Sequence, residues 1–169
     1  MNTTGGNERF RRLRVLALTL ISGPVLFAVV LYFLLGMDEG GMDTPPVWVL
    51  IVQVAVAVAL YAAVEAIGFQ TDPAKPGDPQ EVGNASFMTF QTQMVLRFAL
   101  CESLTIVSIA LAFVVEPNTF LTYALGGLLS VVLMLVEVLP NERAIRKVEA
   151  SLEQNGTPSH LREAFGLNA

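Results

Sequence analysis

Four apolar runs, each of about 20 residues, dominate the sequence. They cover residues 15–36, 47–69, 92–115 and 119–139. At about 1.5 Å per residue, a helix of that length spans the roughly 30 Å hydrocarbon core of a bilayer. Of the 169 residues, 53% are hydrophobic and only 15% are charged, which is more apolar than a soluble domain of this size needs. The sequence therefore predicts an all-α integral membrane protein with four transmembrane helices.

The segments between these runs predict how the helices are connected. Residues 37–46 form a short acidic loop, and residues 116–118 form a tight turn. Residues 70–86 are the longest polar connection and contain three prolines, which keep a linker extended. We therefore expect a transmembrane domain over residues 15–139, in which a linker joins two helical hairpins.

The two ends of the chain are polar. Residues 1–14 form a basic head that we expect to be disordered, and residues 140–169 form a tail with an amphipathic helix. Asn141 suits the N-cap of this helix, and Ile145, Val148 and Leu152 form one apolar stripe along it. The alternatives for the stripe are the inner headgroup layer, a partner protein, or a solvated helix without a partner.

The basic residues predict the orientation. Short loops rich in Lys and Arg remain on the cytoplasmic side of a membrane. In a four-span topology all of the basic residues outside the spans fall on one side, so both termini are expected to be cytoplasmic and the protein is expected in the inner (plasma) membrane. These residues are Arg9, Arg11, Arg12, Arg14, Lys75, Arg143, Arg146, Lys147 and Arg162.

Two ionisable residues, Arg97 and Glu102, lie inside the third run. Charged groups at membrane depth cost at least a few kcal/mol unless they pair, snorkel or meet water. Five residues turn a helix through about 140°, after one full turn, so these two side chains do not face each other. Arg97 is expected either to snorkel inward or to meet Glu65 or Glu137 in a supporting charge cluster at the inner ends of neighbouring spans.

Glu102 has three alternative roles. In the first, it is neutral and hydrogen-bonds a hydroxyl on a neighbouring span, such as Ser22 or Ser130. In the second, it is an ion- or proton-binding carboxylate that alternates between charged and neutral forms. In the third, it meets a cation from another subunit of a larger complex.

The segment that carries both charges is TQMVLRFALCESLTIVSIALAFVV, residues 92–115. It resembles the second helix of the proteolipid subunit c of rotary ATP synthases. The resemblance implies that Glu102 occupies the proton-carrying position, and the inside-to-outside direction that the basic residues predict for this helix agrees with it. Arg97 has no counterpart there, and the preceding span lacks the repeated glycines of the proteolipid's first helix. The pattern of two hairpins also resembles small uncharacterised bacterial membrane proteins with four helices.

The remaining residues weigh against other classes of function. No basic patch indicates nucleic acid, and a single histidine, His160, with a single cysteine, Cys101, supplies no cluster of metal or haem ligands, so no metal or cofactor is expected. Cys101 and Glu102 point about 100° apart on a helix and form no nucleophile and base pair, so no enzyme is expected. We expect an accessory or oligomeric component of a membrane complex, either a homo-oligomer or a larger assembly, with a protonatable Glu102. The alternative is an oligomeric ion or proton transporter or channel.

Overall fold

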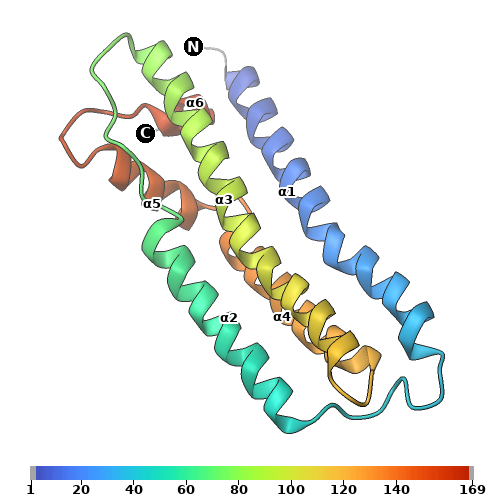
Figure 1. The fold of residues 1–169 in the computed structure, drawn as a ribbon. Helices are drawn as coiled ribbons and strands as arrows, with labels where there is room; N and C mark the ends of the chain where they lie inside the picture. Colours follow the sequence, from blue (N-terminus) through green and yellow to red (C-terminus); the bar gives the residue numbers. More distant parts are fainter. Residues whose placement is uncertain (1–2, 168–169) are drawn as a thin grey trace.

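The computed structural model describes residues 3–167, and every regular element in that range is helical (Figure 1). Four helices are long and apolar enough to cross a membrane, as the four apolar runs predict. Two shorter helices follow them. The elements are α1 (Thr3–Leu31), continued by a π-helical turn η1 (Tyr32–Gly36), α2 (Val47–Ile67), α3 (Pro79–Val114), α4 (Phe120–Glu137), α5 (Glu142–Leu152) and α6 (Leu161–Ala164).

The first helix differs from the sequence prediction. We expected a disordered head before Val15, but α1 begins at Thr3. The head is held in helical form by tertiary contacts, because the ring of Phe10 packs edge-on against Phe165 of the tail with 5.9 Å between centroids. The ion pair between Glu8 and Arg12 in this segment is largely exposed, so it contributes little to the stability of the helix.

The third helix also starts early, at Pro79, well before residue 92 where the apolar run begins. The side chain of Asp78 accepts a hydrogen bond from the backbone N–H of Gln80 at 3.1 Å, which caps the helix. Proline in the first turn is favourable, because its missing N–H would have no partner there. The final part of the predicted linker is therefore helix, and α3 extends beyond the apolar core of the bundle.

The bundle is arranged around the antiparallel pair of α3 and α4 (Figure 1). α2 packs against both members of this pair, whereas α1 packs mainly against α4. The hydroxyl of Tyr123 in α4 donates to the carbonyl oxygen of Pro24 in α1 at 2.5 Å, which links these two helices. α1 and α2 thus lie on opposite sides of the central pair, so the first two spans do not form a packed hairpin of their own.

Helices approach each other very closely at Gly126 of α4. A Cβ atom added there would lie 1.8 Å from the Oγ atom of Ser108 and 2.8 Å from the Nε2 atom of Gln53. Gln53 reaches across from α2 and donates to the carbonyl oxygen of Thr122 at 2.7 Å. The absence of a side chain at Gly126 therefore brings three helices together at one level.

A second polar contact joins α3 and α4 one turn further along. Ser130 accepts a hydrogen bond from the hydroxyl of Thr105 and donates to the carbonyl oxygen of Cys101, both at 2.8 Å. All three residues are buried. Hydroxyl groups that satisfy each other in this way let an apolar bundle contain polar side chains.

The tail folds back onto the bundle. The apolar stripe of α5, which includes Ile145, Val148 and Leu152, is buried in the main hydrophobic core. Asn141 caps this helix by accepting from the backbone N–H of Ala144 at 2.8 Å. The stripe therefore covers the protein's own helices, in contrast to the headgroup layer, partner protein or solvent considered from the sequence.

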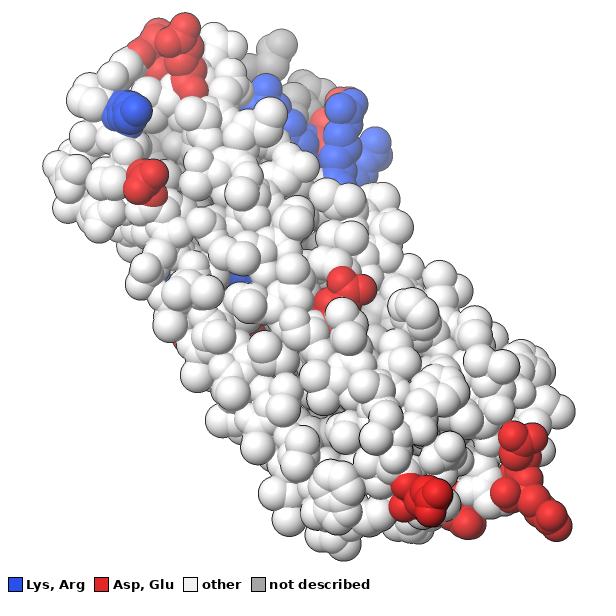
Figure 2. All heavy atoms as spheres, in the orientation of Figure 1, with Lys and Arg blue, Asp and Glu red and all other residues white. Residues whose placement is uncertain are grey.

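The two ends of the bundle differ in charge. The end that holds α5, α6 and the start of α1 is here called the tail end, and the opposite end is the loop end. In Figure 2, Lys and Arg side chains gather near the tail end, only acidic side chains mark the loop end, and the body between them is almost free of charge. The acidic residues of the two loops are Asp38, Glu39, Asp43 and Glu116.

Candidate functional site

Arg97 is fully buried where three helices meet, although an arginine is rarely so enclosed. Its Nε atom donates to the carbonyl oxygen of Glu137 at 2.8 Å, and its Nη1 atom donates to the carbonyl oxygen of Gly68 at 3.0 Å. These carbonyls belong to the C-terminal ends of α4 and α2, where helices carry partial negative charge and lack internal partners. The guanidinium of α3 thus binds the ends of both neighbouring helices.

Aromatic rings complete the surroundings of Arg97. Its guanidinium carbon lies 4.4 Å from the ring centroid of Phe69 and 5.6 Å from that of Phe90. A cation over a ring face is attracted by the negative π surface, most strongly where water is excluded. The position of the charge is therefore fixed by two carbonyls and two rings.

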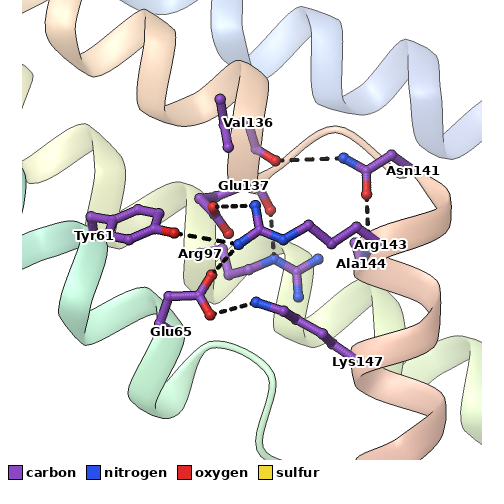
Figure 3. Close-up of polar contacts among 9 residues, drawn as sticks. All are labelled: Tyr61, Glu65, Arg97, Val136, Glu137, Asn141, Arg143, Ala144 and Lys147. Atoms are coloured by element: carbon purple, nitrogen blue, oxygen red, sulfur yellow. Dashed lines mark hydrogen bonds and ion pairs between the residues drawn. The ribbon is translucent and has the colours of Figure 1, made fainter.

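The two carboxylates expected near Arg97 lie in the same region but bind other cations (Figure 3). Glu65 forms ion pairs with Arg143 at 2.6 Å and with Lys147. Glu137, whose side chain is only 1% exposed, pairs with Arg143 at 3.2 Å. Arg97 thus neither snorkels to the surface nor makes an ion pair with these carboxylates, and it meets Glu137 through the backbone.

The five residues Arg97, Glu65, Glu137, Arg143 and Lys147 form what we call the charge cluster, which joins α2, α3, α4 and α5 (Figure 3). The sequence prediction missed its two α5 members. Their four-residue spacing, which places both on one face of an amphipathic helix, is the signal that predicts a shared partner. Hydrogen bonding to Tyr61 and the charges of Glu137 and Glu65 raise the pKa of Arg143, so it is cationic throughout the physiological range.

Glu102 lies outside the charge cluster. It is half-buried on α3, and among the side chains that the structure describes, those of residues 8–167, none makes a hydrogen bond or ion pair with its carboxylate. The two hydroxyls expected to bind it are engaged elsewhere, because Ser22 donates to the carbonyl oxygen of Thr19 at 2.6 Å and Ser130 binds α3 at Cys101. Glu102 is thus a membrane-depth carboxylate whose partner is not found in the described part of the chain.

The direction that Glu102 faces follows from helix geometry. Asn84 and Glu102 are 18 residues apart, which is five turns of a helix with about 3.6 residues per turn, so both lie on the same side of α3. Asn84 accepts a hydrogen bond from Arg9 of α1 at 2.8 Å. Glu102 therefore lies on the α1 side of α3, away from the side that binds α2.

Residues that could hold a metal ion are not grouped in the described part of the chain. Across residues 3–167, no three His, Cys, Asp or Glu side chains come together in a way that could bind one. Cys101 is a buried free thiol in the core. The polar groups described above make ion pairs and hydrogen bonds with one another.

Comparison of the sequence and the structure with family models, curated proteins and solved structures finds no match. What the chain does is therefore inferred from its own residues.

Proposed function

We propose that the chain is an integral membrane protein of the cell's inner membrane and works as an accessory or oligomeric component of a membrane complex. Large apolar side chains are exposed on each of the four long helices. Leu26 is 65% exposed, Ile51 and Ile106 are each 63% exposed, and Leu128 is 61% exposed. Apolar surface on all sides is unfavourable in water but matches the hydrocarbon core of a bilayer.

The charge distribution supports an orientation with both termini in the cytoplasm. Nine of the ten basic residues lie outside the apolar runs and gather at the tail end, and the loops of the other end have only acidic residues. Lys and Arg near the ends of spans favour the cytoplasmic side. In this orientation the tail, with α5 and α6, lies against the cytoplasmic ends of α2, α3 and α4.

The observation that carries the proposed role is the unpartnered carboxylate of Glu102. Thr105 and Ser130, which are buried deep in the bundle, find partners inside it. An ionised carboxylate at the same level without a partner is unfavourable by at least a few kcal/mol, so it needs a proton or a cation from another chain. A neighbouring subunit that covers the α1 side of α3 would supply either a hydrogen-bond partner for the neutral acid or a basic partner.

Replacing Glu102 with leucine should separate the assembly, because the contact loses its polar group. Losing one partner of a desolvated polar pair weakens association by about 2 kcal/mol or more, which is roughly 30-fold in the dissociation constant. Native mass measurements on the protein, purified in mild detergent, would report this as a shift from complex to monomer. If Glu102 is neutral in the complex, Glu102→Gln should retain part of the assembly.

Ser103→Leu is the matched control, since Ser103 is the next residue on α3, is also half-buried, and bonds only the carbonyl oxygen of Ala99 in its own helix. The control should assemble like the natural protein. A natural protein that is monomeric and free of bound proteins, both in detergent and in bilayer discs, would contradict the proposed role.

An oligomeric ion or proton transporter or channel is the second candidate, and the same carboxylate favours it. A single acid at membrane depth that lacks a fixed partner is suited to binding and releasing a proton. If the protein conducts protons, reconstituted vesicles should dissipate a pH gradient and Glu102→Gln should abolish the flux. Natural protein that leaves the gradient as stable as in empty vesicles would remove this candidate.

A further inference from the structure

A groove separates the first part of α1 from the first part of α3 at the tail end. Its volume is about 460 Å³. The wall from α1 is basic at its start and apolar further along, and the wall from α3 has Phe87 and Met88 between the amides Asn84 and Gln91. The side chains that matter here are Arg9, Arg12, Leu13, Leu16, Phe87 and Met88.

The two arginines lie one helical turn apart on the side of α1 that faces the groove. Arg9 donates to Asn84 through Nη1 at 2.8 Å, and its guanidinium carbon lies 5.5 Å from the ring centroid of Phe87. A guanidinium has five N–H donors, so the others remain for an anion. Arg12 pairs with Glu8 at 3.7 Å, and both side chains are largely exposed, at 81% and 59%, which makes this pair weak.

The apolar part of the groove is preformed. Phe87 packs against Phe165 of the tail with 5.5 Å between ring centroids, and Phe165 is fully buried. Met88 beside it is 64% exposed, so an apolar surface remains open. The tail therefore fixes one wall of the groove without filling it.

The level of the groove along the helices matches the boundary of a bilayer. On α1 the arginines come just before the apolar run that starts at residue 15, and on α3 the groove ends at Gln91, next to the run that starts at residue 92. Both helices therefore change from polar to apolar sequence beside it. Basic groups are at headgroup depth there, and the apolar residues reach toward the hydrocarbon.

We propose that this groove binds one anionic phospholipid of the inner leaflet. Its phosphate is held by Arg9 and Arg12, and part of one acyl chain lies along Leu16 and Met88. The chain as a whole has a net charge of −5, so a basic site is a local feature that does not follow from the overall charge. A free phosphate would leave the apolar half of the groove empty, which favours a lipid. The inference does not depend on the role of Glu102.

Titration of the full-length protein in detergent with phosphatidylglycerol, followed by native mass measurement, tests this site. Replacing Arg9 and Arg12 together with glutamine should weaken binding by about 30-fold, since each basic residue near the lipid contributes about 1 kcal/mol. The matched control replaces Arg11 and Arg14 with glutamine. This pair removes the same charge from the same exposed turns of α1 but does not line the groove, so binding should be retained.

Met88→Trp provides a separate test of the apolar half, because a larger side chain there should exclude the acyl chain while both arginines remain. Weaker binding in this variant and weak binding of phosphatidylcholine to the natural protein are the expected results. Equal losses in the two double variants would show diffuse attraction to the basic head and overturn the proposal. Competition by soluble glycerol phosphate as effective as that by the lipid would overturn it as well.

Discussion

Arg97→Met should lower the free energy of unfolding by about 3 kcal/mol, because two hydrogen bonds from a charged group and a desolvated cation–π contact are lost together. The carbonyl oxygens of Gly68 and Glu137 would lose the donor that joins the ends of α2 and α4 to α3. The gain from no longer burying a charge offsets part of the loss. Thermal unfolding in detergent, followed by circular dichroism, measures the change.

Two further variants separate the geometry of Arg97 from its charge. Arg97→Lys keeps the charge but presents a single ammonium group in place of the planar fork, so it should recover only part of the stability. Lys75→Met removes a cation from the exposed linker and should have little effect. Stability of Arg97→Met within about 0.5 kcal/mol of the natural protein, the range of surface substitutions, would show that the buried guanidinium does not hold the helices together.

Gly126→Ala should destabilise the protein by about 2 kcal/mol or more, as expected for an extra carbon atom forced into a packed core. The added Cβ atom would meet the Oγ atom of Ser108 at 1.8 Å and its Cβ atom at 2.7 Å, so α3 and α4 would have to move apart. The hydrogen bond from Gln53 to Thr122 lies at the same level and would be strained. The midpoint of thermal unfolding reports the loss.

Gly23→Ala is the matched control for this substitution. It adds the same atom to a helical glycine, but nothing lies within 4 Å of the added position. Its stability should be unchanged or higher by about 0.5–1 kcal/mol, since alanine favours helix over glycine. Ser108→Gly combined with Gly126→Ala should recover part of the loss, because the clashing side chain is gone. Additive losses in this double variant would contradict the proposed clash.

The sequence predicts the four long helices well, because hydrophobic length is a local property that each segment carries alone. Asn141 as an N-cap is predicted for the same reason, and the structure confirms it. The early start of α1, at Thr3, could not be predicted, because Phe10 in this segment contacts Phe165 in the far end of the chain. Likewise, the apolar stripe of α5 predicts a buried face but does not identify what covers it.

The sequence predicts three of the five residues of the charge cluster but not how they pair. The depth of Arg97, Glu65 and Glu137 follows from counting residues along the spans, and the structure brings all three to the same end of the bundle. The sequence alone favours pairing opposite charges with each other, and it gives no weight to the carbonyl groups at helix ends. Glu102 has no partner among the described side chains, and we propose that a second molecule supplies one.

The position of the acceptors of Arg97 along the chain has a consequence for biosynthesis. Gly68 precedes the arginine, but Glu137 is translated forty residues after it. During translation, α3 therefore emerges with a charged side chain for which one of its two acceptors does not yet exist. The short turn after α3 brings α4 to it with little delay, so we expect α3 and α4 to enter the bilayer together as a pair.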